Sequence, residues 1–411
     1  MVNIHEGERV TMRHTSDQWR ALAAIVVLTS TLLLTACDSS SPTSSPTATS
    51  SPTPTPTPTP APTPTSILTI ATADSHSCVV QGDGTVSCWG DNSFGQLGVG
   101  NTTDQSKPVE VLRLTDVVEV VADGNYSCAL HGDGSVSCWG YNFSGQLGDG
   151  TRTDRSTPVT VVGVTDVVEI AAGRNHSCAL HEDRTVSCWG FNLAGQLGDG
   201  TQTDRLTPVQ AVGLTDVVEI AAGVAHSCAL HGDGTVSCWG YNEFGQLGDG
   251  TRTDRSTPVT VVGVADVVEI SVGGSHACAR NEDGTVSCWG LGLLGDGTQT
   301  FQLTPLQVVG LTDAVEIAAG AGYSCAVHGD GTVSCWGFNA FGELGDGTTT
   351  NRVTPVTVVG LTDVVEIATG GYSCALLGDG TVSCWGRNEY GQLGGGSVTD
   401  SSTPVEVVGI E

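Results

Sequence analysis

The cysteines are the residues whose spacing most directly predicts chemistry. Of the fifteen in the chain, Cys37 stands alone, and the other fourteen form seven pairs whose members are always ten residues apart. The pairs are Cys78 with Cys88, Cys128 with Cys138, Cys178 with Cys188, Cys228 with Cys238, Cys278 with Cys288, Cys325 with Cys335, and Cys374 with Cys384. Disulfides, metal–thiolate bonds and buried free thiols all suit paired cysteines. Zinc sites usually hold cysteines at closer spacing with four ligands converging, so the spacing favours disulfides.

A turn between the members of each pair supports the disulfide interpretation. The first pair flanks Gly82-Asp83-Gly84, which suits a three-residue hairpin loop that ends in a left-handed residue. In that register Cys78 lies opposite Cys88 at a non-hydrogen-bonded position, with Cα atoms about 4.5 Å apart. Each disulfide would close a short loop worth roughly 2.7 kcal/mol. The third pair carries Arg184 where the others have Gly, so we expect backbone strain there on the order of 1 kcal/mol.

Histidine and aspartate also recur. A first histidine set (His76, His176, His226 and His276) alternates with tyrosines and suits a structural hydrogen bond to the adjacent turn. A second set (His131, His181, His231 and His328) precedes the turn between the cysteines, where we expect exposure. The loop Gly198-Asp-Gly-Thr-Gln-Thr-Asp-Arg205 resembles a calcium loop, but several carboxylates must converge on one ion, and an Asp–Arg turn fits equally well. We therefore expect no resident metal and no cofactor.

The chain shows no catalytic constellation. Neither a Gly-x-Ser-x-Gly motif nor a phosphate-binding loop is present. A residue that recurs in every copy of a repeat is usually architectural, whereas catalysis needs a singular placement. We therefore predict a protein that is not an enzyme.

These residues belong to an internal repeat of about 50 residues. The motif Cys-Trp-Gly places tryptophans at seven positions: Trp89, Trp139, Trp189, Trp239, Trp289, Trp336 and Trp385. Each copy contains four short apolar segments separated by Gly-rich turns, and none shows a helical pattern. Residues 67–411 therefore predict an all-β fold, a seven-bladed β-propeller with four antiparallel strands in each blade.

The third copy illustrates the expected strands, which are residues 167–172, 176–180, 185–190 and 208–212. If they are successive neighbours, the first turn and the long loop before the fourth strand lie at one end of the blade. The cysteine hairpin and the link to the next copy lie at the other end. We call these ends the long-loop face and the short-turn face. We expect the tryptophans to be core residues that pack against the next blade.

The repeat is similar to the regulator of chromosome condensation repeat. The resemblance rests on Val-Val-Glu-Ile-Ala-Ala-Gly-x-x-His-Ser-Cys-Ala-Leu, Gly-Asp-Gly-Thr-Val-Ser-Cys-Trp-Gly, Asn-x-x-Gly-Gln-Leu-Gly-Asp-Gly and Thr-Pro-Val, and it covers residues 67–411. It implies a seven-bladed propeller. It does not imply one function, because members of that family include a nucleotide-exchange factor for a small GTPase, a secreted inhibitor of β-lactamases and scaffolds.

The first 66 residues predict export and attachment to a membrane. Residues 1–36 read as a signal peptide whose apolar core begins at Ala21, with Met1 or Met12 as the start. Leu34-Thr-Ala-Cys37 resembles a bacterial lipobox, which implies lipid attachment at Cys37; an uncleaved anchor is the alternative. Residues 37–66 are rich in Ser, Thr and Pro and predict an extended linker, with a docking peptide as the alternative.

Aromatic and aliphatic residues that vary among the copies follow Trp-Gly on the long-loop face. The candidate contact residues are Tyr141, Phe143, Phe191, Tyr241, Phe244, Leu291, Leu293, Phe338, Phe341 and Tyr390. Such residues dominate protein interfaces, although they could equally cap the blades. The loop of the fifth copy is three residues shorter and lacks Asn-x-x-Gly-Gln, which predicts a notch or an apolar patch.

The charge excludes some partners. The net charge is −29 and Lys107 is the only lysine, so we expect no nucleic-acid partner. We predict a monomeric, non-enzymatic scaffold, tethered to a membrane outside the cytoplasm, that binds a protein or glycan through its long-loop face. The alternatives are a nucleotide-exchange regulator of a small GTPase and an extracellular propeller hydrolase.

Overall fold

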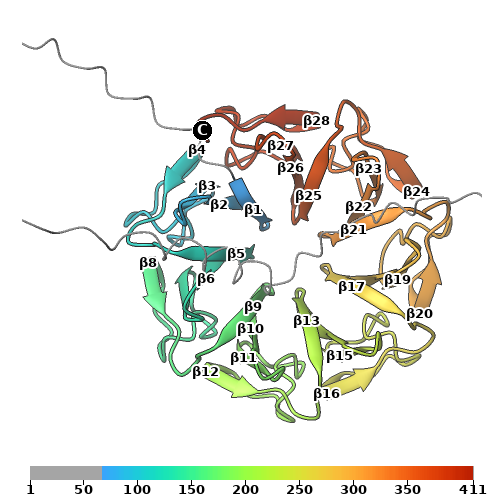
Figure 1. The fold of residues 1–411 in the computed structure, drawn as a ribbon, viewed down its shortest axis with the longest axis horizontal. Helices are drawn as coiled ribbons and strands as arrows, with labels where there is room; N and C mark the ends of the chain where they lie inside the picture. Colours follow the sequence, from blue (N-terminus) through green and yellow to red (C-terminus); the bar gives the residue numbers. More distant parts are fainter. Residues whose placement is uncertain (1–66, 411) are drawn as a thin grey trace, which may run out of the picture. The chain divides into compact units, whose positions relative to one another are not determined.

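The computed structural model describes residues 67–410 and shows seven four-stranded sheets arranged in a ring (Figure 1). This is the predicted all-β propeller. No helix within these residues is long and apolar enough to cross a membrane. The predicted signal peptide, Cys37 and the expected linker lie outside the described residues.

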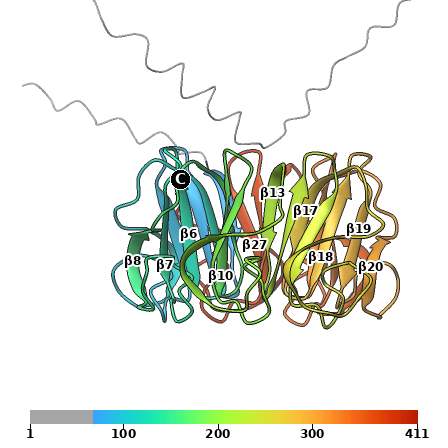
Figure 2. The ribbon, with the colours of Figure 1, turned by 90° about the horizontal axis from the view of Figure 1, so that it is seen from below.

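Each blade contributes one strand to each of four positions, from the inner edge to the outer edge of the ring (Figures 1 and 2). The inner strands are β1 (Ile67–Thr72), β5 (Val117–Asp123), β9 (Val167–Ala172), β13 (Val217–Ala222), β17 (Val267–Val272), β21 (Ala314–Ala319) and β25 (Val364–Thr369). The second strands are β2 (His76–Gln81), β6 (Tyr126–His131), β10 (His176–His181), β14 (His226–His231), β18 (His276–Asn281), β22 (Tyr323–His328) and β26 (Tyr372–Leu377).

The third strands are β3 (Val86–Gly90), β7 (Val136–Gly140), β11 (Val186–Gly190), β15 (Val236–Gly240), β19 (Val286–Gly290), β23 (Val333–Gly337) and β27 (Val382–Gly386). The outer strands are β4 (Gln105–Glu110), β8 (Arg155–Thr160), β12 (Arg205–Gln210), β16 (Arg255–Thr260), β20 (Gln302–Gln307), β24 (Arg352–Thr357) and β28 (Ser401–Glu406). The blades are numbered 1 to 7 in chain order.

Every blade consists of four strands that are consecutive in the chain and antiparallel. Blade 1 is β1–β4 and blade 7 is β25–β28, so among the described residues no sheet mixes strands from the two ends of the chain. Packing of β1 against β25 and β26 closes the ring. We call each contact between successive blades a seam.

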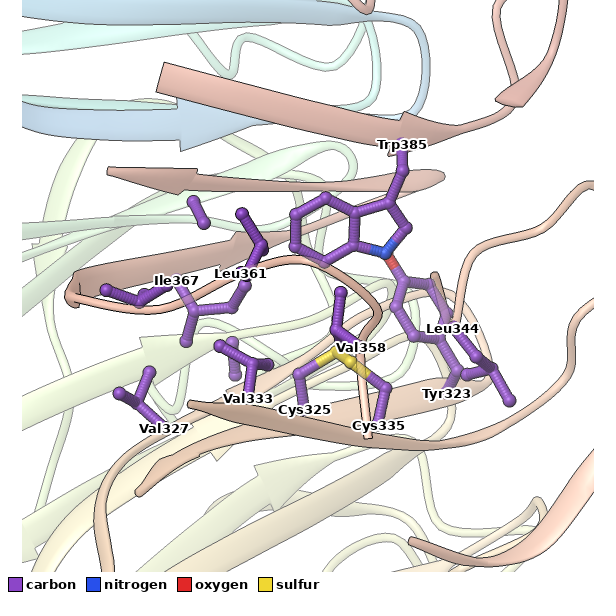
Figure 3. Packing of buried hydrophobic residues seen from close by; sticks show 13 residues of the cluster. Tyr323, Cys325, Val327, Val333, Cys335, Leu344, Val358, Leu361, Ile367 and Trp385 are labelled. Atoms are coloured by element: carbon purple, nitrogen blue, oxygen red, sulfur yellow. A yellow bond between two sulfur atoms is a disulfide. The ribbon is translucent and has the colours of Figure 1, made fainter. Parts of the chain in front are cut away.

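The core lies in the seams. At the seam between blades 6 and 7, Trp385 packs against the Cys325–Cys335 disulfide, Leu344 and Val358 (Figure 3). All seven tryptophans of the repeat are fully buried. The prediction that each would pack against the next blade was wrong, because each indole lies against the preceding blade. The face of the strand on which a side chain projects determines the neighbour, and spacing alone does not reveal that face.

The cysteine hairpins follow the predicted register. Cys78 pairs with Cys88 across β2 and β3, and Gln81 N–H donates to the Thr85 carbonyl oxygen at 2.9 Å. A disulfide joins the two cysteines in every blade, with Cα–Cα distances of 4.0 to 4.1 Å. The seven disulfides join Cys78 to Cys88, Cys128 to Cys138, Cys178 to Cys188, Cys228 to Cys238, Cys278 to Cys288, Cys325 to Cys335, and Cys374 to Cys384. The predicted pairing is therefore confirmed at all seven hairpins.

The last residue of the hairpin loop is left-handed, as the turn geometry requires. Gly84 ends the first loop with φ of 78°. Arg184 adopts φ of 66° at the same place in the third hairpin. The expected left-handed arginine is therefore present.

Hydrogen bonds confirm the two faces. The first loop residue after the third strand bonds to the turn between the first two strands; Tyr141 N–H, for example, donates to the Asn125 carbonyl at 2.9 Å. At the other end the hairpin meets the link between blades, where Gly132 N–H donates to the Asp116 carbonyl at 2.8 Å.

The expected bounds of the outer strand lie too far along the chain. In blade 3 the strand is Arg205–Gln210, not 208–212. Val209 pairs with Cys188, and a bulge lets Arg205 reach Gly190. The bulge and the polar residues at the start of the strand conceal where it begins.

Candidate functional site

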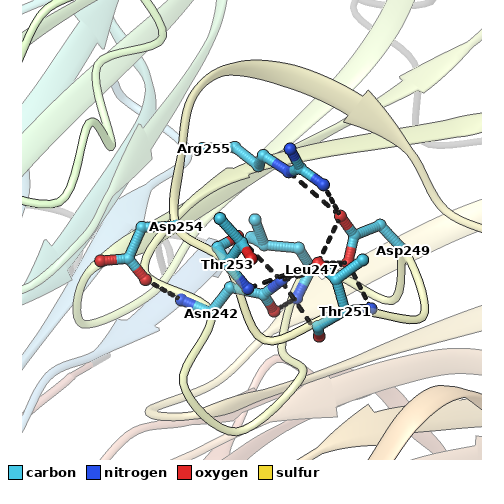
Figure 4. Close-up of polar contacts among 7 residues, drawn as sticks. All are labelled: Asn242, Leu247, Asp249, Thr251, Thr253, Asp254 and Arg255. Carbon is cyan, nitrogen blue, oxygen red and sulfur yellow. Dashed lines mark hydrogen bonds and ion pairs between the residues drawn. The ribbon is translucent and has the colours of Figure 1, made fainter.

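The long-loop face is built on a hydrogen-bonded turn, which blade 4 shows in full (Figure 4). The Asn242 side chain accepts a bond from Leu247 N–H at 3.0 Å and donates to the Thr253 carbonyl at 3.1 Å. Asp254 accepts the Asn242 N–H at 2.8 Å. Arg255 donates to Asp249 at 2.9 Å. The loop is therefore stiff, and its flanking side chains have defined positions.

The same contacts decide between the two interpretations of the Asp–Gly loop. Both carboxylate oxygens of Asp249 accept bonds from protein groups, which are the Thr251 hydroxyl, the Asn242 amide and the Arg255 guanidinium. Asp199 and Asp346 form the same contacts. These carboxylates act as turn caps. Within residues 67–410, no group of three or more His, Cys, Asp or Glu side chains is placed to hold a metal ion.

The last residue of this turn bridges six of the seven seams. In blade 1 the Gln96 carbonyl accepts bonds from Trp139 Nε1–H at 2.8 Å and from the Ser127 hydroxyl at 3.1 Å, both in blade 2. Because Ser127 uses its proton there, His76 Nε2–H donates to its oxygen at 2.8 Å. Burial lowers the pKa of His76 to about 4, so the imidazole is neutral. The first histidine set thus joins neighbouring blades instead of bonding to its own turn.

The seam between blades 4 and 5 lacks the serine of this arrangement. Blade 5 has Ala277 in place of the serine, so buried His226 lacks the hydroxyl that bonds to the other histidine rings of the set. The pKa of His226 is lowered to about 3 by burial and by the nearby His276 and His176. The second histidine set is also less exposed than expected, since His181 is half-buried and its Nε2 lies 3.0 Å from the Ser187 hydroxyl.

The candidate contact residues divide into two groups. Side chains that project into solvent are Phe143 at 67% exposure, Phe338 at 47%, Phe341 at 42% and Leu291 at 38%. Those that are half-buried are Tyr141, Phe191, Tyr241, Phe244, Leu293 and Tyr390. Leu193, which follows Trp-Gly in the third copy, is 67% exposed. Phe301, at 41%, was missed, because it stands where the other copies have Asp or Asn, such as Asp254. Both interpretations of the aromatic residues are therefore realised, at different positions.

The half-buried rings support the exposed ones. Tyr141 lies between Phe94, with ring centroids 4.8 Å apart, and Phe143, at 6.4 Å. Arg387 lies over the Phe341 ring at 5.5 Å from its centroid. Contacts of this kind hold the exposed rings in place, so less side-chain entropy is lost when they bind a partner.

Charged residues form an uneven inner rim that the sequence reasoning missed. The turns between the first two strands carry Asp74, Asp123 and Arg174 in blades 1 to 3, while blades 4 to 7 have small or apolar residues there. Arg174 and Asp74 form an ion pair at 3.5 Å. Burial and the nearby Asp74 carboxylate raise the pKa of Asp123 to about 7. The sequence carried a signal for these residues, because charged residues occur in this turn in only three of the seven copies. A residue that differs among copies on a fixed scaffold can confer specificity.

A second missed set is the glutamate of Val-Val-Glu-Ile, which we call the inner glutamates: Glu119, Glu169, Glu219, Glu269, Glu316 and Glu366. Each accepts an N–H of the next inner strand; Glu169, for example, bonds to Ile220 N–H at 3.0 Å. Burial raises the pKa of Glu119 to about 8 and that of Glu366 to about 7. Arg280 contacts Glu269 at 2.6 Å. A repeated charge in an apolar strand was the available signal.

Apolar exposure is not confined to the long-loop face. Near the start of the inner strands, on the short-turn face, Val118, Val218, Val315 and Val365 are 37% to 51% exposed. The side chains there are small and aliphatic, whereas the long-loop face carries the exposed phenylalanines. Hot spots of interfaces are rich in large rings, which distinguishes the two faces.

Comparisons with solved structures agree with this architecture. Human WBSCR16 is 25% identical over 75% of this chain and 85% of that chain, with a TM-score of 0.69. Yeast RCC1 (Prp20), solved bound to Kap60, is 24% identical over 75% of this chain and 79% of that chain, with a TM-score of 0.67. The CRINKLY WD40 ectodomain of the Arabidopsis thaliana receptor kinase ACR4 is 21% identical over 84% of this chain and 98% of that chain, with a TM-score of 0.50.

Family models identify the repeat directly. A search of curated proteins finds no match. The regulator of chromosome condensation (RCC1) repeat model matches residues 330–377 and 379–411. The RCC1-like domain model matches residues 25–312, which is more than half of the sequence. The chain therefore belongs to the RCC1-like domain family.

Proposed function

We propose that this protein is a non-enzymatic binding scaffold, held to a membrane outside the cytoplasm, whose long-loop face recognises another protein. The observation that carries the proposal is the set of exposed rings on that face, led by Phe143 and Phe338. They stand on stiff turns and are supported by neighbouring aromatics. Rigid, exposed aromatics offer much apolar area at a low entropic cost.

Relatives with the same fold bind proteins. Yeast RCC1 has been solved with Kap60, and the Prp20p structure is described with its binding to Gsp1p and histones. Those partners belong to those proteins. A glycan partner remains an alternative for this face.

The disulfides favour a location outside the cytoplasm. Seven buried disulfides form and persist in an oxidising compartment and are rare in the reducing cytosol. A small GTPase that acts in the cytosol would not meet such a protein. Lipid attachment at Cys37 and a linker over residues 37–66 complete the proposal.

Affinity measurements on the two faces test the proposal. A partner is first identified by cross-linking at the cell surface, and its Kd is then measured for purified variants. Phe143→Ala and Phe341→Ala should each weaken binding by about 1–3 kcal/mol with the fold retained. His131→Ala and His181→Ala on the short-turn face serve as matched controls and should change little. The reverse pattern would refute the assignment of the binding face.

A further inference from the structure

The seam between blades 5 and 6 lacks the turn carbonyl that accepts the tryptophan indole N–H at the other six seams. At the seam between blades 3 and 4, the Gln196 carbonyl accepts bonds from Trp239 Nε1–H at 2.8 Å and from the Ser227 hydroxyl at 3.1 Å. The tryptophan half of this contact recurs at five more seams, with distances of 2.8 to 2.9 Å. The carbonyl always belongs to the last residue of the Asn-x-x-Gly-Gln or Asn-x-x-Gly-Glu turn.

Blade 5 has no such turn, since Leu291-Gly292-Leu293 stands where blade 3 has residues 191–196. As a result, the Nε1–H of fully buried Trp336 has no hydrogen-bond partner within residues 67–410. Leaving a buried donor unpaired costs about 1–3 kcal/mol. The unpaired indole N–H marks the position at which a carbonyl oxygen belongs.

Apolar side chains beside this position are exposed, while Trp336 Nε1 itself is buried beneath them. At the seam between blades 1 and 2, the turn residue Phe94 packs on Tyr141, and Tyr141 is half-buried. Phe338 is the residue of blade 6 that corresponds to Tyr141, and without a turn to cover it the ring is 47% exposed. Leu291 is 38% exposed on the blade 5 side.

The other seams also show which residue of the next blade the turn contacts. The turn glycine of blade 3, Gly195, approaches the backbone of Ser256 so closely that an added Cβ would lie 2.5 Å from its Cα. In blade 6 the equivalent residue is Val353, which is half-buried. We call the set Leu291, Leu293, Trp336, Phe338 and Val353 the blade-5 notch.

We propose that the blade-5 notch binds a turn of the partner polypeptide, which presents a main-chain carbonyl oxygen to Trp336 Nε1–H and an apolar side chain to Phe338. The inference rests on the proposed function, because it assumes a protein partner on the long-loop face. Six seams of the same molecule show that a turn of this kind fills the equivalent space. The partner would thus supply the segment that blade 5 lacks.

A peptide with the turn sequence tests the notch without the natural partner. The probe is a cyclised peptide with the sequence of residues 191–197, which is uncharged and so avoids repulsion by a chain of net charge −29. It is titrated into the full protein carrying ¹⁵N-labelled tryptophan. The Trp336 indole resonance, assigned with Trp336→Phe, should shift in a saturable manner. Trp289 is the internal control, because its Nε1–H already donates to the Gln246 carbonyl at 2.9 Å.

Two variants sharpen the test. In the filled-notch variant, Leu291–Leu293 is replaced by the six residues of 191–196, which should abolish peptide binding. Phe338→Ala keeps the loop and should weaken binding by about five-fold or more. An unshifted Trp336 resonance, equal shifts of Trp336 and Trp289, or unchanged binding by the filled-notch variant would each overturn the notch. Failure of the proposed function would appear separately, as partner binding that is insensitive to Phe143→Ala and Phe341→Ala.

Discussion

His226 is the one histidine of the first set whose ring lacks a serine hydroxyl partner in the described residues. At other seams a serine hydroxyl of the next blade bonds to the ring nitrogen, as Ser227 does for His176 at 2.8 Å. Ala277 removes that hydroxyl. We expect Ala277→Ser to raise the free energy of unfolding by about 1 kcal/mol, because one buried hydrogen bond is worth that much. Chemical denaturation of the purified protein measures the change.

The matched control for this prediction breaks an intact contact. Ser127→Ala removes the partner of His76 Nε2 and should lower the free energy of unfolding by about 1–3 kcal/mol. Equal stability of the protein with and without the Ala277→Ser change would show that water already satisfies His226.

Arg184 is the second residue-scale exception. It has φ of 66° at a position that the other hairpins reserve for glycine. Its ion pair with Asp216 is 56% exposed on both sides and contributes little. Arg184→Gly should therefore stabilise the protein by about 0.5–1 kcal/mol. A rise in the denaturation midpoint checks this, and a fall would mean that the ion pair outweighs the backbone strain.

The residue scale also shows where sequence reasoning succeeds. The ten-residue spacing and the Gly-Asp-Gly turn together predict the register of the hairpin, because both constraints are local. The unpaired Trp336 was not predictable, because its missing acceptor belongs to the preceding blade. The side-chain positions of Phe143 and Tyr141 could not be separated either, since their exposure depends on a neighbouring loop.

At the scale of elements, the inner strands predict a dependence of stability on pH. The folded pKa values of Glu119 and Glu366 are raised to about 8 and about 7, so the folded protein holds more protons than the unfolded chain. Their stabilising contribution is present at low pH and is lost as the pH rises through those values. The buried histidines have an opposite effect on stability, because their pKa is lowered to about 4 in the folded protein. Their effect is confined to pH values below about 6.5, the ordinary pKa of histidine.

Stability should therefore fall between about pH 6.5 and 8. Denaturation curves across that window test the prediction. Glu119→Gln should show a smaller fall in stability, because the amide does not titrate, while its oxygen still accepts the Ile170 N–H. Glu406→Gln, on the exposed end of an outer strand, is the control and should leave the slope unchanged. A wild-type slope of zero or of opposite sign would contradict the assignment to the inner strands.

The elements were predictable to different degrees. Inner strands such as β9 have the predicted bounds, because each is a compact apolar run between turn residues. The outer strand β12 begins three residues earlier than expected, at Arg205, since a bulge opposite β11 and a polar sequence hide its start. Polar residues at the edge of a sheet carry little periodic signal.

At the scale of the whole molecule, lipid attachment is the main untested prediction. Leu34-Thr-Ala-Cys37 follows an apolar segment of signal length, so the mature protein should begin at a diacylated Cys37. Intact-mass and peptide mass spectrometry of the membrane fraction measure this directly. Cys37→Ser should release the protein from the membrane. Detection of residues 1–36 in the mature chain would disprove the prediction.

The number of blades was predictable from the sequence, because each Cys-Trp-Gly motif marks one copy. The closure of the ring was not. Strands at the two ends of a chain can share a sheet or form separate blades, and the repeat has the same sequence in both cases. In this molecule Ile67 begins blade 1, and Glu406 ends the last strand of blade 7.

This closure has a consequence for the order of assembly. Six seams join blades that are adjacent in sequence, and each can form as soon as its two blades exist. The seam between blades 7 and 1 joins segments almost 300 residues apart, as in the bond from Thr69 to Glu366 at 2.7 Å. Because no shared sheet holds this seam together, it should form last during synthesis. It should also be the first seam to separate when the ring is strained.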